Sequence, residues 1–158
     1  MIIPPLSKEE LRAYFARIGC AVPRRPTLTT LRAAHRAHLY SIPYENLDIQ
    51  LDRELTLDPD DVFRRLVHER RGGWCYDMNG LLGRVLAALG FDVRYVCGAV
   101  MREQRGDDVI GNHVVLLAEL DGQTWIADAG LGDGFLEPVP LAAGTYLQGP
   151  FMTRVECV

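Results

Sequence analysis

The hydrophobic pattern of this 158-residue chain changes its period at Gly90. Before that glycine, apolar residues recur at helical spacing. After it, they form short runs rich in β-branched and aromatic residues, separated by turn-forming sequence. Helices and strands segregated in this way are typical of the α+β class. We predict a helical bundle over residues 1–90, packed on an antiparallel β-sheet or partial β-barrel over residues 91–158.

The apolar spacing predicts four helices in the first half. Ser7 and Glu10 form a capping box at the start of the first one. Pro43 disfavours helical geometry at Ile42, so the segment "SIPYENLDI" after the second helix is predicted to be an extended loop. The predicted helices cover residues 8–18, 29–40, 59–68 and 76–89.

Composition and charge argue against two classes of partner. Apolar residues make up 48% of the chain, and no apolar run approaches the ~20 residues that span a bilayer. The formal net charge is -4 and the arginines are spread along the chain, which argues against nucleic acid. The start "MIIPPLSKEE" lacks the pattern of a signal peptide. We expect a cytoplasmic protein that binds neither membranes nor nucleic acid.

The four cysteines, Cys20, Cys75, Cys97 and Cys157, lie far apart and form no C-x-x-C pair, so no metal site is expected. Cys75 differs from the others because it follows "RGGW" at the predicted start of a helix. Unpaired backbone N-H groups and the helix dipole stabilise an anion there. Cys75 is therefore either a reactive thiolate or a small buried hydrophobe, and its position alone favours neither.

A base that could activate Cys75 must come from four histidines. His35 and His38 lie on an arginine-rich helix and His68 lies near a helix C-terminus, so a solvated helix face or a favourable dipole contact explains these three better. His113 opens the strand "HVVLLAEL". His113 is the candidate base whose ring a residue of the next strand could orient.

The strands "HVVLLAEL" and "QTWIADAG" are predicted to pair through a turn at Asp121 and Gly122. In this register, His113 faces Gly130 and is a diagonal neighbour of Asp128 on one face of the sheet. Asp128 could then orient the imidazole, as the acid does in a catalytic triad. Gly130 would leave the space opposite His113 free of a side chain. A change of one residue in the loop would move Asp128 to the other face.

The segments "IPYENLDI", "RGGWCYDMNG", "NHVVLL" and "WIADAGLGDG" together resemble the arylamine N-acetyltransferase family, in order and spacing, over most of the chain. The resemblance implies a papain-like core and a triad of Cys75 as nucleophile, His113 as base and Asp128 as orienting acid. It further implies that acetyl-CoA acetylates Cys75 as a co-substrate. An arylamine, arylhydroxylamine or hydrazine then takes the acetyl group in a ping-pong cycle. No tightly bound cofactor is expected.

The resemblance also assigns supporting roles. Tyr44 matches an aromatic position of the acceptor pocket, although a loop aromatic that covers the bundle is an equal alternative. Leu131, between Gly130 and Gly132, matches a position that is often aromatic in the family, so the pocket is expected to be roomier here. Arg71 matches an arginine that pairs with the acid two residues after the cysteine, which is Asp77 in this chain.

Family members typically continue into a third α/β region that closes over the site, and this chain is expected to lack it. Whether the chain forms a homo-oligomer, or receives that region from elsewhere, is left open. Three alternative functions stay open. An amide synthase of the macrolactam-forming type shares the same motifs, a truncated chain could be a non-catalytic binding module, and Cys, His and Asp alone are also compatible with a thiol peptidase.

Overall fold

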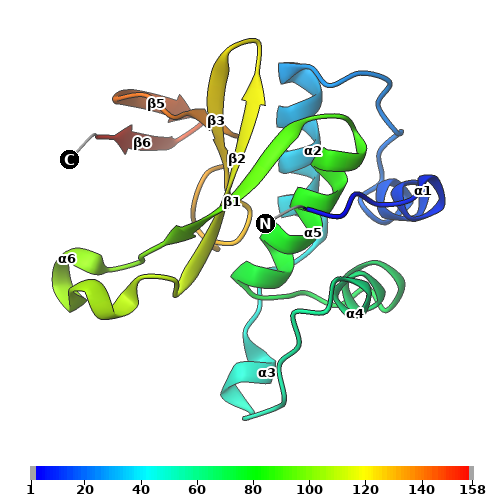
Figure 1. Cartoon of the computed structure of the whole chain (residues 1–158), viewed down its shortest axis with the longest axis horizontal. Helices are drawn as coiled ribbons and strands as arrows, with labels where there is room; N and C mark the ends of the chain where they lie inside the picture. The colour runs from blue at the N-terminus through cyan, green and yellow to red at the C-terminus, as the bar shows by residue number, and fades with distance from the viewer. Residues whose placement is uncertain (1–2, 157–158) are drawn as a thin grey trace.

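The computed structural model describes residues 3–156, so Cys157 lies outside the described residues. The helical segments of the first 90 residues and the strands occupy separate sides of the molecule, as Figure 1 shows. In chain order the elements are α1 (Lys8–Arg17), α2 (Leu28–Ser41), α3 (Leu47–Gln50), α4 (Pro59–Phe63), η1 (Arg64–His68), α5 (Cys75–Ala88), β1 (Asp92–Gly98), α6 (Arg102–Arg105), η2 (Asp107–Val109), β2 (His113–Leu120), β3 (Gln123–Ala127), β4 (Val139–Pro140), β5 (Gly144–Gln148) and β6 (Phe151–Val155).

The four predicted helices are present, with local signals where the sequence places them. The Ser7 hydroxyl accepts from the Glu10 backbone N-H and the Glu10 carboxylate accepts from the Ser7 N-H, which completes the capping box. Ile42 is extended, as expected before Pro43. Gly90, just after α5, has a positive φ of 91°, a conformation that a residue without a Cβ adopts easily.

Two local expectations were incomplete. The segment "SIPYENLDI" is not extended throughout, because its second part forms the short helix α3. The third predicted helix changes character at residue 64, where α4 gives way to the π-helical turn η1. Such turns insert a residue into a helix and so rotate the side chains that follow.

The strands form an open antiparallel sheet in the order β1-β2-β3-β4, with β5 and β6 as a separate hairpin. The predicted register of the β2–β3 hairpin is confirmed, because Leu120 pairs with Gln123 and Leu116 with Ala127. The α+β class is therefore confirmed, and the sheet does not close into a barrel. The division into two domains at residue 90 stays a prediction.

The helical half and the strand half share one hydrophobic core cluster. Leu82 and Leu86 of α5 lie in it with Leu116 and Ala118 of β2 and with Trp125 of β3. Figure 1 shows α5 lying against β1 and β2. The start of α5 is thereby brought to the beginning of β2 and the end of β3.

The expectation of a solvated face for His35 and His38 was wrong, because both rings are fully buried. They extend the buried stripe of α2 that begins with Leu31 and Ala34. The Nε2 atom of each ring has no hydrogen-bond partner among the described residues. His68 is exposed, as expected.

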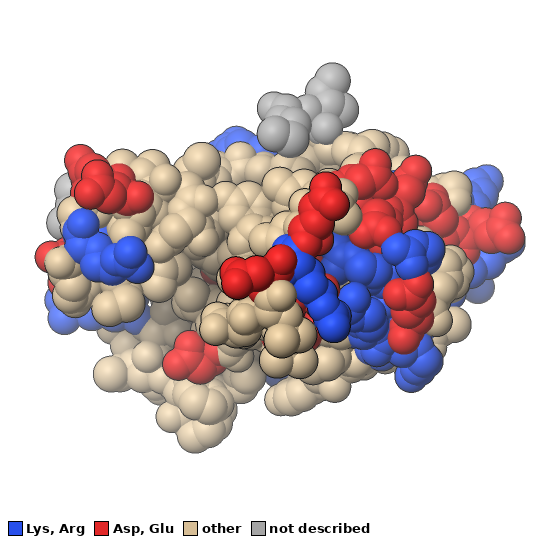
Figure 2. Space-filling view, turned by 90° about the horizontal axis from the view of Figure 1, so that it is seen from below, with Lys and Arg blue, Asp and Glu red and all other residues tan. Residues whose placement is uncertain are grey.

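The surface bears charges of both signs. Figure 2 shows acidic and basic side chains intermixed on one part of the face in view rather than gathered into a basic patch. In the part of the chain that the structure covers, every helix is too short or too polar to cross a membrane.

Candidate active site

Cys75 is the first residue of α5, and its side chain is buried. The residue before it, Trp74, takes the capping position without a side-chain hydrogen bond to the helix. No capping side chain therefore occupies the N-H groups of the first turn, and these groups favour an anion. The Cys75 sulfur is directed at the backbone carbonyl of Asn112, 3.9 Å away.

His113 and Asp128 meet as the predicted register requires. The Nε2 atom of His113 lies 2.7 Å from Oδ2 of Asp128, and both side chains are almost completely shielded from solvent. Asp128 follows directly after β3, and His113 is the first residue of β2. The strand pairing therefore places a carboxylate against an imidazole on one face of the sheet.

The electrostatics of this pair favour the charged forms. Burial opposes a charge on His113, but hydrogen bonds with Asp128 and Cys75, together with their negative charges, raise the pKa of His113 to about 9. Burial also opposes the Asp128 carboxylate, yet hydrogen bonds from His113 and Asn79 hold its pKa below the ordinary value. Because Nε2 faces Asp128, Nδ1 is the ring nitrogen that is left for Cys75.

Asn79 is a site residue that the sequence reasoning missed. Its amide nitrogen donates to Oδ1 of Asp128 at 2.8 Å and to the carbonyl of Val114 at 2.6 Å, and its oxygen accepts from the Ala129 N-H at 2.8 Å. One buried side chain on α5, the helix of Cys75, is thus hydrogen-bonded to Asp128 and to Val114, the residue that follows His113. The spacing Cys75 to Asn79, one helical turn, was the available signal.

Gly130 was expected to leave the space opposite His113 free of a side chain, but the structure gives a different reason for the glycine. A Cβ at Gly130 would lie 2.8 Å from the Cα and 2.9 Å from the carbonyl oxygen of Cys75, so this glycine allows the segment after β3 to approach α5. Its N-H also donates to Oδ1 of Asp128. The strand residue that faces His113 is Gly98 on β1, where a Cβ would lie 3.1 Å from the imidazole Cδ2.

The two residues expected to line an acceptor pocket lie near Cys75 and Asp128. Tyr44 forms an isolated bridge with Gly73, and its ring lies under 4 Å from where a Cβ of Gly132 would be. Burial and then the nearby Cys75 raise the pKa of Tyr44. Leu131 is 37% exposed and lines a cavity of about 210 Å³ that also touches Asp128.

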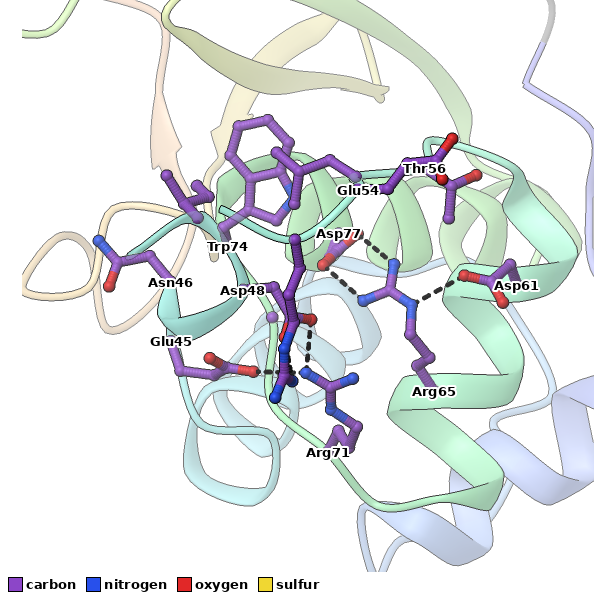
Figure 3. Close-up of a pocket in the computed structure, with 14 residues that line it drawn as sticks. Glu45, Asn46, Asp48, Glu54, Thr56, Asp61, Arg65, Arg71, Trp74 and Asp77 are labelled. Atoms are coloured by element: carbon purple, nitrogen blue, oxygen red, sulfur yellow. Dashed lines mark hydrogen bonds and ion pairs between the residues drawn. The ribbon is translucent and has the colours of Figure 1, made fainter. Parts of the chain in front are cut away.

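The expected pair of Arg71 and Asp77 is not formed. The Arg71 guanidinium bonds to Asp48 at 2.5 Å and lies 3.5 Å from Glu45, both in the loop and helix after α2. Asp77 is bound instead by Arg65, as Figure 3 shows. Arg65 belongs to the π-helical turn η1 and satisfies the Asp77 carboxylate, while Arg71 is paired with Asp48.

Together these groups can support acyl transfer. A thiol at a helix N-terminus, an imidazole and an orienting carboxylate are the parts of a thiol nucleophile and its base. Within residues 3–156, no cluster of three or more His, Cys, Asp or Glu side chains could hold a metal ion.

Comparisons with known proteins point to the same chemistry. Residues 27–153 match a family model described as N-acetyltransferase. An arylamine N-acetyltransferase / N-hydroxyarylamine O-acetyltransferase of Salmonella typhimurium is 40% identical over 89% of this chain and 50% of its own length. The proansamycin X synthase of Amycolatopsis mediterranei is 36% identical over 88% of this chain and 55% of its own length.

The fold is also similar to that of solved structures. The arylamine N-acetyltransferase of Mycobacterium marinum in complex with CoA superposes with a TM-score of 0.84 at 33% identity, over 94% of this chain and 57% of that one. The chain spans about half the length of the curated relatives it matches.

Proposed function

The chain belongs to the arylamine N-acetyltransferase family, and on that premise we propose that it transfers an acetyl group from acetyl-CoA to an arylamine, arylhydroxylamine or hydrazine. The acetyl group is carried as a thioester on Cys75. The observation that carries this proposal is the hydrogen-bonded pair of His113 and Asp128 beside the thiol at the start of α5.

The first half-reaction acetylates the enzyme. The Cys75 thiolate attacks the acetyl carbonyl, and the first-turn N-H groups of α5 stabilise the oxyanion that develops. The bond to the coenzyme sulfur breaks, and the protonated His113 supplies a proton to that sulfur as it leaves. Asp128 stays ionised and holds the ring in place, as its lowered pKa favours.

The second half-reaction returns the thiol. The amine nitrogen of the acceptor attacks the thioester carbonyl, while His113, now neutral, accepts the proton that the amine loses. The Cys75 sulfur leaves as a thiolate, which restores the starting ion pair. Acyl exchange between thiols is nearly balanced in energy, so the first half-reaction is reversible, and formation of the amide in the second draws the cycle forward.

The acceptor is proposed to bind between Tyr44 and the loop that carries Leu131. Tyr44 is 43% exposed, and the exposed part of its ring is proposed to stack on the aryl group of the acceptor. Leu131 offers an aliphatic surface where the family often has an aromatic one. We expect acceptors with larger or non-planar groups to be accepted more readily here.

A second candidate uses the same triad with another acyl donor. The similarity to the proansamycin X synthase favours a macrolactam-forming amide synthase over a peptidase or a non-catalytic module. Acetyl transfer remains the first candidate because the relatives from Salmonella typhimurium and Mycobacterium marinum are both named arylamine N-acetyltransferases. We place the enzyme in the cytoplasm, where acetyl-CoA is available.

Mass spectrometry of the intact protein tests the proposal. After mixing with acetyl-CoA, we expect a mass increase of one acetyl group that disappears when an arylamine or hydrazine is added. A Cys75→Ser variant should show no thioester, whereas the exposed-cysteine variant Cys97→Ser should behave like the wild type. A protein that stays unmodified while its Cys75 alkylates normally would overturn acetyl-CoA as the donor.

A further inference from the structure

Asp77 occupies the same turn of α5 as Cys75, and its side chain is only 2% exposed. It packs against the loop that leads into the cysteine, because a Cβ at Gly73 would lie 2.6 Å from the Cβ of Asp77. The position of the carboxylate is therefore linked to the backbone two residues before Cys75.

Arg65 binds this carboxylate with both arms of its guanidinium. The distances are 3.0 Å from Nη2 to Oδ1 and 3.1 Å from Nη1 to Oδ2, and Nε is 2.9 Å from Oδ2 of Asp61. The Arg65 side chain is 12% exposed. Figure 3 shows the guanidinium between the two carboxylates, at the edge of a cavity of about 210 Å³. Two-armed pairs of this kind fix orientation as well as charge.

The ionised Asp77 is a competitor of the Cys75 thiolate. Both groups lie in the first turn of α5, where the helix dipole can favour an anion. They share that favourable field, and the negative charge of one disfavours ionisation of the other. A buried carboxylate without a partner would therefore make the thiolate harder to form. The guanidinium of Arg65 cancels that charge where it arises.

We propose that Arg65 is a positioning residue for the nucleophile. Its two-armed ion pair with Asp77 holds the first turn of α5 in place and neutralises the carboxylate, so that the thiolate of Cys75 forms beside His113. This role rests on the proposed function in one respect only, namely that Cys75 acts as a thiolate.

The other ionisable groups around Cys75 stay unchanged in the test. They are His113 on β2, with Asp128 behind it, Tyr44 in the loop after α2 and Tyr76 on α5 itself. A change in the titration of Cys75 on substitution of Arg65 or Asp77 is therefore attributable to that pair.

The test measures the rate of Cys75 alkylation by iodoacetamide against pH, in a background where Cys20, Cys97 and Cys157 are serine. Arg65→Met removes the positive charge, so we expect the midpoint to rise by about one pH unit. Asp77→Asn removes the negative charge and leaves Arg65, so the midpoint should fall. In the double variant the two effects should nearly cancel.

Arg64→Met is the matched control. Arg64 is the neighbouring arginine, 53% exposed, and it pairs with Asp61 and Glu69 but not with Asp77. The pH midpoint of Cys75 alkylation in Arg64→Met should equal that of the parent protein. Shifts of opposite sign for Arg65→Met and Asp77→Asn would support the proposal, because a purely structural defect would impair both variants in the same direction.

Two outcomes would overturn the proposal: an unchanged midpoint in Asp77→Asn, or shifts of the same sign in both single variants. Arg65→Met leaves the buried Asp77 carboxylate unpaired and could fail to fold. In that case Asp77→Asn and the double variant still test the proposal, because neither has a carboxylate at position 77. The measurement uses no acetyl-CoA. A chain that fails to transfer acetyl groups but shows the opposite shifts would contradict the proposed function and leave the role of Arg65 supported.

Discussion

The side-chain amide of Asn79 donates to one oxygen of Asp128 across 2.8 Å, while the other oxygen of that carboxylate is bonded to His113. The carboxylate of Asp128 is thus held on both sides. Its orientation depends on a residue of α5, the helix that carries Cys75.

Replacing Asn79 with alanine should damage both stability and reactivity. The Ala129 N-H and one oxygen of Asp128 would each lose a buried hydrogen-bond partner, so we expect the free energy of unfolding to fall by about 2 kcal/mol or more. The rate of Cys75 alkylation near neutral pH should fall as well. Urea denaturation and iodoacetamide kinetics measure the two effects.

Asn46→Ala is a suitable comparison, because Asn46 is exposed and makes no capping hydrogen bond from its side chain. It should change the free energy of unfolding by less than about 0.5 kcal/mol. Equal losses in the two variants would show that Asn79 has no special role.

The pair of His113 and Asp128 predicts a pH window of greatest stability. The pKa of His113 is raised from 6.5 to about 9, so its contribution is complete below 6.5 and is lost as the pH rises through about 9. The pKa of Asp128 is lowered from 3.8, so its contribution is present above that value and is lost on acidification. The pair should therefore stabilise the fold most between these two ordinary values.

Urea denaturation of the wild type and of His113→Gln at about pH 6 and about pH 9.5 checks this window. The wild type should lose more free energy of unfolding between these two conditions than the variant does. The same loss in both proteins would mean that the alkaline change arises elsewhere.

His38 should destabilise the protein in acid. Complete burial, with smaller contributions from His35 and Arg17, lowers the pKa of His38 from 6.5 to about 3. The stability that the neutral ring provides is present above 6.5 and is lost as the pH falls toward 3. His38→Gln can keep a bond to the Tyr14 hydroxyl, and its free energy of unfolding should decline less between about pH 6.5 and pH 4.5. Equal slopes would contradict the prediction.

Two glycines give opposite expectations for the same substitution. At Gly130 an alanine Cβ would collide with backbone atoms of Cys75, 2.8 and 2.9 Å away, so Gly130→Ala should cost about 2 kcal/mol and slow alkylation. At Gly80, inside α5, no heavy atom lies within 4 Å of the added Cβ. Gly80→Ala should therefore raise the free energy of unfolding by about 1 kcal/mol. Thermal melts measure the contrast, and it would be refuted if the melting temperatures of both variants shifted in the same direction from that of the wild type.

The sequence predicts the part of the site that short-range rules control. The turn at Asp121 and Gly122 sets the hairpin register, and the register alone brings Asp128 to the face of His113. The break at Gly73 and the stripe that follows it place Cys75 at the start of a helix for similarly local reasons. These inferences needed no knowledge of how the two halves pack.

Contacts between distant segments could not be predicted in the same way. The partner of Asp77 depends on the π-helical turn that redirects Arg65, and single-sequence spacing does not reveal such a turn. His35 and His38 continue the buried spacing of Leu31, but their polarity and the arginines between them suggested a solvated face. Asn79 was missed because its three partners come from β2 and from the segment after β3.

The core cluster shared by α5, β2 and β3 has a practical consequence for anyone who studies this protein in solution. The sulfur lies in the helical half, whereas the ring and the carboxylate lie on one hairpin of the strand half. The sulfur meets the other two groups only when the two halves have docked. A chain whose helices had formed but whose sheet had not would contain an ordinary, slowly reacting thiol. Fast alkylation of Cys75 can therefore report the fraction of molecules that have completed assembly, without any added dye or substrate.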